Sequence, residues 1–222
     1  MKLIVTAGDG FAANHIWPMW PQLLEQSTRD TRVVSLGKPA AGNEFIFNAV
    51  LQALEQQTPD LVIVQWAQSQ RLDLIVDTVV KHSTALADPV YFRNLYTMGH
   101  NQWWLSNASG QFYVRNYHHH YIGPTQAQQR TRNYMQSLAA ILTVQGVPYR
   151  FTSTYDTEFT PPDLDHWVWH EAGRGMEHYS RQERFAELRG TEVQPHTLVH
   201  AAWVQEILRP NLDFLDWREV SV

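Results

Sequence analysis

The 222-residue chain contains no cysteine, which excludes a disulfide, a thiolate nucleophile and a cysteine-based zinc site. The fold must therefore depend on a hydrophobic core. Positive charge is also scarce, because 17 Lys and Arg residues stand against 22 Asp and Glu residues and give a formal net charge of -5. Nucleic-acid backbones and anionic membranes are bound by clustered Lys and Arg, so we expect neither partner.

Long apolar runs are missing as well. The first apolar run begins at Leu3 and ends at Ala7, whereas a membrane span needs roughly twenty residues and a signal-peptide core about seven or more. We therefore expect a soluble, cytoplasmic protein. The length suits one α/β domain over residues 1–222.

Apolar periodicity predicts an alternation of strands and helices. Strands are expected at residues 3–7, 32–36, 60–66 and 148–154. Helices are expected at residues 22–26, after a cap at Asn43, and at 71–82, 125–144 and 196–208. Residues around 84–122 are interpreted as an aromatic-rich insertion with partial helix. This order predicts a three-layer α/β/α sandwich with a central parallel sheet.

Four segments resemble, in order, the conserved blocks of the SGNH (GDSL) hydrolases. They are "TAGDGF…WPMWPQLL", "PAAGNEFIFNAVLQAL", "PDLVIVQWAQSQR" and "VQPHTLVHAAWVQEILRPNL". In the family the first block has Gly-Asp-Ser at a strand end, and the last has Asp-x-x-His-Pro before a Gly-His pair. The resemblance implies the flavodoxin-like SGNH fold. The form with Trp66 and Arg71 is similar to SGNH-like proteins of bacteriophages, which would place the chain in a host cytoplasm or a virion.

The catalytic residues that this resemblance implies are replaced. In the family a Ser hydroxyl attacks an ester carbonyl, a His takes its proton and an Asp orients the His. The matching positions hold Gly10 for the Ser, Gln194 for the His and Thr191 for the Asp. None of these side chains can do that chemistry. We therefore expect a pseudoenzyme that has lost Ser-His-Asp ester hydrolysis and acts by binding a ligand or a partner.

Part of the family's oxyanion site is also changed. The family's oxyanion Asn is matched by Ala67, and the Gly of its second block is matched by Ala40 or Gly42. Backbone N–H groups survive any of these substitutions, so part of an anion-binding pocket is expected to remain.

Two charged residues lie where a parallel sheet binds ligands, at the carboxyl ends of its strands. Asp9 would act as a base or nucleophile, or would cap the following helix. Arg71 follows Trp66 and would bind an anion bidentately or form a structural salt bridge. Together with the Trp residues, Arg71 suggests a glycan or an acylated small molecule as the ligand. The candidate pocket residues are then Asp9, Gly10, Gly42, Asn43, Trp66, Ala67, Arg71 and His196.

Two alternatives use other residues. An active esterase with relocated chemistry would pair Asp9, Ser69 or Ser106 with His196 or His100. A metal-dependent enzyme would use His166 and His170, since the spacing i, i+4 places two imidazoles on one face of a helix. No other cofactor is expected.

Overall fold

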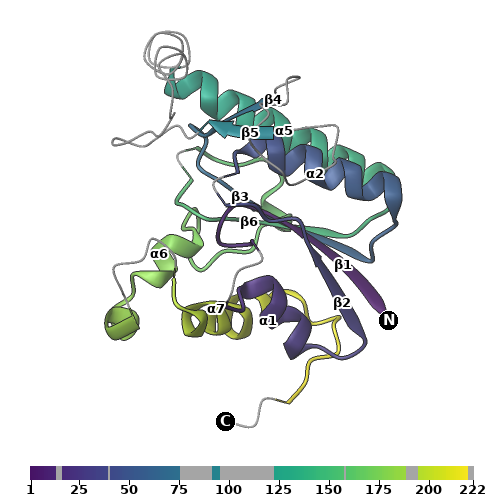
Figure 1. Ribbon diagram of the computed structural model, residues 1–222, viewed down its shortest axis with the longest axis vertical. Coiled ribbons are helices and arrows are strands. Elements are labelled where there is room, and N and C mark those ends of the chain that lie inside the picture. The colour runs from purple at the N-terminus through teal and green to yellow at the C-terminus, as the bar shows by residue number, and fades with distance from the viewer. Residues whose placement is uncertain are drawn as a thin grey trace, which may run out of the picture.

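The computed structural model describes residues 1–13, 17–39, 41–75, 92–95, 123–157, 159–188 and 195–219. Its centre is a four-stranded parallel sheet with the strand order β2-β1-β3-β6 (Figure 1). The strands are β1 (Lys2–Ala7), β2 (Thr31–Ser35), β3 (Leu61–Trp66) and β6 (Tyr149–Ser153). The predicted parallel sheet is confirmed.

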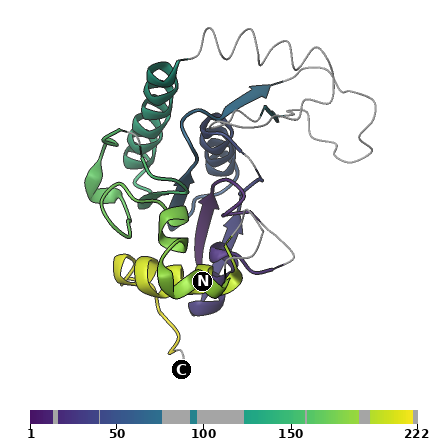
Figure 2. The same ribbon diagram turned by 90° about the vertical axis from the view of Figure 1, so that its left-hand side faces the viewer.

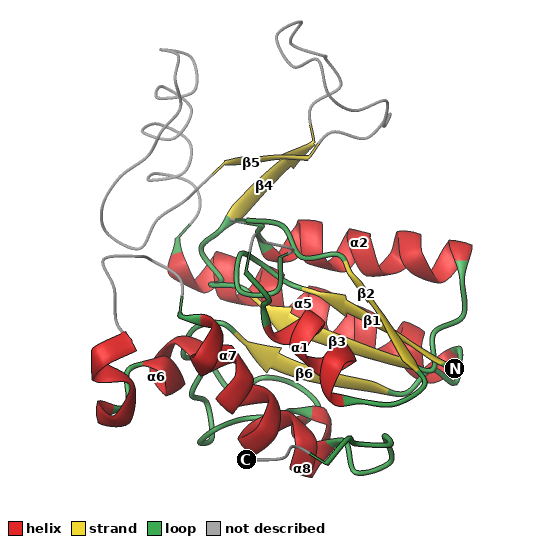
Figure 3. Cartoon of the chain, turned by 60° about the horizontal axis from the view of Figure 1, so that its bottom comes forward, coloured by secondary structure: helices red, strands yellow, loops and turns green. Residues whose placement is uncertain are grey.

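Helices cover both faces of this sheet. Figure 3 shows α2 and α5 on one face and α1 and α7 on the other. These helices are α1 (Trp20–Ser27), α2 (Asn43–Gln56), α5 (Pro124–Val144) and α7 (Thr197–Trp203). The predicted α/β/α layering is therefore confirmed. None of the helices in the described part of the chain combines the length and the apolar character that a membrane span requires.

Each face of the sheet carries its own hydrophobic core. Successive strand residues point to opposite faces, so Ile4 and Ile63 belong to the core with α1 and α7, whereas Val5 and Val64 belong to the core with α2 and α5. All residues of β3 are buried, as expected for a parallel strand that is covered on both sides.

The chain after β6 consists of short helices joined by loops, as predicted. They are η2 (Leu164–His166), α6 (Met176–Ser180) and η3 (Glu183–Leu188). After α7 come a π-helical turn, η4 (Val204–Leu208), and the short α8 (Arg209–Asn211). Figures 1 and 2 show α7 beside α1 on the lower face of the sheet.

The prediction of a helix over residues 71–82 is wrong at its start. Residues 72–75 form strand β4 (Leu72–Ile75), which pairs antiparallel with β5 (Phe92–Leu95) in a separate two-stranded sheet. The apolar residues fit a helical period, but pairing with a segment 20 residues later overrides a short local pattern. Residues 76–82 and most of the predicted insertion lie outside the described residues.

The closing helix differs from its prediction in two ways. His196 is the N-cap residue rather than part of the helix, and its Nδ1 accepts a hydrogen bond from the Leu198 N–H at 3.2 Å. The periodicity of residues 196–208 places Leu198, Ile207 and Leu208 in the core, but Leu198 is 56% exposed. The buried residues of α7 are Val199, His200 and Trp203, whereas Ile207 and Leu208 in η4 are buried as expected.

His200 joins α7 to the beginning of α1. Its Nδ1 accepts a hydrogen bond from the backbone N–H of Trp20 at 3.3 Å, and the edge of its ring packs against Phe11. The side chain is fully buried. Burial disfavours the imidazolium, and this lowers the pKa of His200 from 6.5 to about 3.

The buried imidazole predicts a loss of stability in acid. The unfolded chain binds more protons than the folded chain below pH 6.5, so stability that is present above pH 6.5 is lost as the pH falls toward 3. Between pH 7 and pH 4.5 the wild-type chain should lose about 2 to 3 kcal/mol more unfolding free energy than His200→Gln does. Urea unfolding at both pH values measures this difference. Equal pH dependence in the two proteins would contradict the buried neutral imidazole.

Candidate functional site

The candidate site lies at the carboxyl end of the sheet, where the strand order reverses. From β1 the chain passes to β2 on one side, and from β2 it crosses to β3 on the other side of β1. Ligands of open α/β sheets bind outside such a reversal. The loop after β1 carries Asp9 and Gly10, and the loop after β3 carries Ala67 and Arg71. Parallel strands therefore bring four of the sequence-predicted residues to one edge.

Asp9 is buried at this edge, and both of its carboxylate oxygens have partners. It is 1% exposed, and its Oδ2 lies 2.8 Å from Nη1 of Arg71. Its Oδ1 accepts hydrogen bonds from the Thr154 hydroxyl at 2.8 Å and from the Phe11 N–H at 3.1 Å. The hydrogen bond from the Phe11 N–H closes a turn over residues 9–11. This turn is not the beginning of a helix, because α1 begins only at Trp20. Asp9 is thus a buried ion-pair partner and not a helix cap.

The guanidinium of Arg71 forms hydrogen bonds with other groups of the protein. Besides Asp9, its Nη1 donates to the Ala41 carbonyl at 3.1 Å, and its Nη2 donates to the Tyr155 hydroxyl at 3.1 Å. The guanidinium carbon also lies 5.4 Å from the centre of the Tyr155 ring. Of the two roles expected for Arg71, the structural salt bridge is the one that forms.

Asn43 does not cap α2, contrary to the prediction. Gly42 is the N-cap residue, and Asn43 is the first residue of the helix. The Asn43 side chain reaches Ala67 instead, with Oδ1 accepting from the Ala67 N–H at 2.8 Å and Nδ2 donating to the Ala67 carbonyl at 3.1 Å. Nδ2 also donates to the Thr131 hydroxyl at 3.0 Å. Asn43 therefore holds the loop after β3 against α2 and α5.

The side chain of Asp73, which lies 31 residues after Gly42 in the sequence, caps the N-terminus of α2. Its Oδ1 accepts from the Gly42 N–H at 2.8 Å and its Oδ2 from the Phe45 N–H at 2.7 Å. A Cβ on residue 42 would lie 2.6 Å from Oδ2, so this approach requires glycine. Burial raises the pKa of Asp73, and the two backbone hydrogen bonds oppose the rise. No local sequence pattern predicts this contact, because the partners are 31 residues apart.

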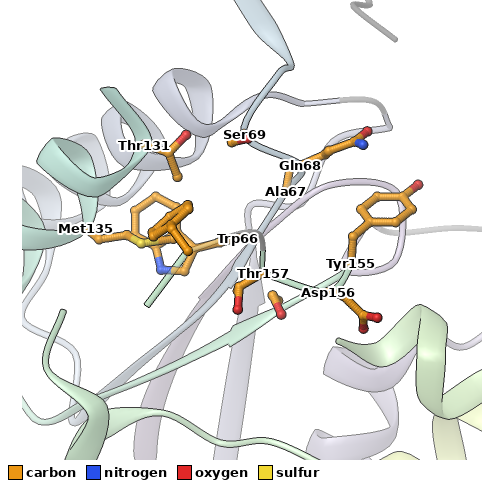
Figure 4. A pocket seen from close by; sticks show the side chains of 11 residues that line it. Trp66, Ala67, Gln68, Ser69, Thr131, Met135, Tyr155, Asp156 and Thr157 are labelled. Carbon is orange, nitrogen blue, oxygen red and sulfur yellow. The ribbon is translucent and has the colours of Figure 1, made fainter. Parts of the chain in front are cut away.

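A small pocket opens beside these residues. Trp66, Met135 and Thr131 lie on one side of it and Tyr155 on the other (Figure 4). Its volume is about 20 Å³, enough for roughly one water molecule or a group of similar size. The lining also includes Ser69, which is buried, and Ser153.

Two lining residues carry buried polar atoms that have no hydrogen-bond partner among the described residues. These atoms are Nε1 of Trp66 and Oγ of Ser153. The two residues are register partners at the ends of β3 and β6. Buried polar groups are seldom left without a partner, so these atoms are candidates for contact with a bound molecule. The strand-end rule that selected Arg71 would also have selected Ser153.

His166 and His170, which their sequence spacing pairs on one helix, do not share a helix in the structure. His166 lies in η2, bonds Oδ1 of Asp163 through Nδ1 at 2.9 Å and stacks on Tyr149. His170 lies beyond that helix, beside Glu171 and His178. The expected helical pair of His166 and His170 is therefore wrong. Thr191, Gln194, Ala40, His100 and Ser106 lie outside the described residues.

No family model matches the sequence, and no curated protein matches it. Among solved structures, the psychrotrophic esterase EstA from Pseudoalteromonas sp., inhibited by monoethylphosphonate, is similar over 96% of this chain and 100% of its own, with a TM-score of 0.52 and 11% identity. TesA has a TM-score of 0.45, 13% identity and coverage of 95% and 100%. The acetylxylan esterase Axe2 from Geobacillus stearothermophilus has a TM-score of 0.44, 11% identity and coverage of 92% and 93%.

The chain therefore has the α/β fold of the SGNH-type esterases. The structural similarity extends over nearly all of its length.

Removal of Arg71 tests the ion pair at the sheet edge. Arg71→Ala leaves the buried Asp9 carboxylate without its cation, which should reduce the free energy of unfolding by about 3 to 5 kcal/mol. Arg174→Ala is the matched control, because Arg174 pairs with Asp156 at the surface, where the two side chains are 48% and 39% exposed. The control should change stability by about 1 kcal/mol or less. Equal losses in the two variants, measured by urea unfolding, would contradict the role of Arg71.

Proposed function

We propose that this chain uses an esterase-type scaffold to bind a ligand and does not hydrolyse esters. The resemblance assigns the family's nucleophile position to Gly10, in the loop after β1, and Gly10 has no hydroxyl. The resemblance also assigns Gln194 and Thr191 to the places of the catalytic His and Asp. Losing one member of such a triad reduces the rate by several orders of magnitude, because the residues act as a unit.

The observation that carries this proposal is the position of the Asp73 carboxylate. Ester hydrolysis passes through an oxyanion, which needs N–H groups that point at the developing negative charge. The N–H of Gly42, one of the two positions that match the family's oxyanion Gly, already donates to Asp73. The N–H of Ala67, at the position of the family's oxyanion Asn, donates to Asn43. A carboxylate at this place disfavours a second negative charge.

The geometry gives the relocated hydrolase less support. His196, the base that this alternative requires, is exposed at the beginning of α7, and its Nδ1 accepts a hydrogen bond from its own helix. Asp9, its candidate nucleophile, is buried in an ion pair with Arg71. A carboxylate that is held by Arg71, Thr154 and a backbone N–H is a poor nucleophile, because attack would break these bonds.

The pocket beside Trp66 supports a short acyl group as the part of the ligand that is bound. Trp66 and Met135 offer an apolar surface for a methyl group, and the Ser153 hydroxyl, which has no partner among the described residues, can donate to a carbonyl oxygen. The pocket volume of about 20 Å³ admits roughly one water-sized group, so the acyl methyl group would fill it and the carrier of the acyl group would lie outside. We therefore propose an acetylated sugar or another small acetyl ester as the ligand class.

Restoring the nucleophile alone should not restore hydrolysis. We expect the wild-type chain and Gly10→Ser to hydrolyse p-nitrophenyl acetate at least about 10³-fold more slowly than an SGNH esterase assayed in parallel, because the base is still missing and the Gly42 and Ala67 N–H groups are already paired. The release of p-nitrophenol measures the rate. Saturable hydrolysis by the wild-type chain, or esterase-like turnover by Gly10→Ser, would overturn the proposal.

The acyl pocket has its own test. In saturation-transfer NMR with N-acetylglucosamine and glycerol triacetate, the acetyl methyl protons of at least one probe should receive the strongest saturation. Ser153→Ala should weaken the binding of that probe by about fivefold or more, since one net hydrogen bond is lost. Ser27→Ala, at the far end of α1, is the control and should bind as the wild-type chain does. Absence of saturation for both probes, or equal binding by Ser153→Ala, would contradict an acetyl pocket.

A further inference from the structure

Three metal-ligating side chains that the candidate site does not use meet in the segment after β6. His170 and Glu171 precede α6, and His178 lies within it. Each offers one ligand atom, and these atoms all lie within 4.8 Å of one another. They come from two places in the chain that only the local fold brings together, so helical periodicity could not have identified them.

Two ligand atoms of the cluster, one from His170 and one from Glu171, are already as far apart as two ligands of one metal ion. Nε2 of His170 lies 3.4 Å from Oε1 of Glu171. Two ligand atoms at bonding distance from a tetrahedral Zn²⁺ ion are themselves about 3.4 Å apart. His170 and Glu171 can therefore bind the same ion without a change in their separation, and only the nitrogen of His178 needs to approach.

The hydrogen bonds around His170 leave its Nε2, the nitrogen that could bind a metal ion, without a proton. Arg184 Nε donates to Oε1 of Gln182 at 2.8 Å, which fixes the Gln182 amide so that its Nε2 faces Nε2 of His170 at 2.8 Å. An amide nitrogen can only donate, so Nε2 of His170 is the acceptor. A metal ion needs that deprotonated nitrogen and would take the place of the Gln182 amide. Tyr179 holds the imidazole in position by an edge-to-face contact.

His178 provides a second, independent observation. Its Nδ1 is buried and has no hydrogen-bond partner among the described residues. Its ring lies nearly parallel to that of His170, with centroids 6.0 Å apart. Such an arrangement gives no hydrogen bond between the rings, and so it leaves His178 without an evident structural role other than packing.

We propose that His170, Glu171 and His178 bind a divalent cation of the Zn²⁺ type. Two imidazole nitrogens and one carboxylate oxygen suit Zn²⁺ and its late first-row neighbours and leave a fourth position for water. The ion would tie the loop before α6 to α6 itself. Because the Glu177 N–H in α6 donates to the Thr154 carbonyl at 2.8 Å, the ion would also brace the end of β6.

Titration of the whole chain with ZnCl₂, after dialysis against a chelator, tests the site. Isothermal calorimetry should show one saturable site per chain, and Co²⁺ should give the intense visible absorption of a tetrahedral complex. Glu171→Gln and His178→Ala should each weaken Zn²⁺ binding by at least about tenfold. The Glu171 side chain is 61% exposed, so Glu171→Gln is expected to fold normally, and circular dichroism verifies this for both variants.

His166→Ala is the matched control, since His166 lies in η2 outside the cluster. It should bind Zn²⁺ with the affinity of the wild-type chain. Absence of saturable binding would overturn the proposal. So would wild-type affinity in a folded Glu171→Gln, or an equal loss in His166→Ala, because scattered surface histidines would then account for the binding.

Discussion

The carboxyl edge of the sheet depends on one buried ion pair, between Asp9 and Arg71. Asp9 lies in the loop after β1 and Arg71 in the loop after β3, and Thr154 and Tyr155 after β6 bond to the same two side chains. The Ala41 carbonyl joins the loop between β2 and α2 to them. Burying two charges is costly unless the remaining polar atoms are also paired. Here both carboxylate oxygens of Asp9 and both terminal nitrogens of Arg71 have hydrogen-bond partners, and one interaction therefore fixes the loops that follow all four strands.

Under the proposed binding function, this arrangement accounts for an esterase-type fold that does not hydrolyse esters. In a hydrolase the polar groups at this edge must point toward the substrate and tolerate charge that develops there. In this chain these polar groups form hydrogen bonds within the protein itself. Asp73 accepts a hydrogen bond from the Gly42 N–H, and the Asn43 side chain bonds both the N–H and the carbonyl of Ala67. The buried polar atoms that still lack a partner among the described lining residues belong to Trp66 and Ser153, and binding is the function that these atoms support.

The sheet and its main helices could be predicted from the sequence, because β3 is a continuous apolar run and α2 and α5 have long amphipathic periods. Contacts between distant segments could not. Residues 72–75 have a helical pattern but pair with β5, and Asp73 occupies the cap for which Asn43 was the local candidate. The strand-end rule places Asp9 and Arg71 at the carboxyl edge of the sheet, where they lie, whereas their mutual pairing required the folded chain.

Labelling with a fluorophosphonate ester tests the central claim most directly. Such reagents phosphonylate an activated serine, and the resemblance assigns the nucleophile position to Gly10. After long incubation with an excess of reagent, the intact mass of the protein should be unchanged, whereas an SGNH esterase treated in parallel should gain one phosphonyl group. A stoichiometric mass increase, located on any serine of this chain, would show an active nucleophile and contradict the account.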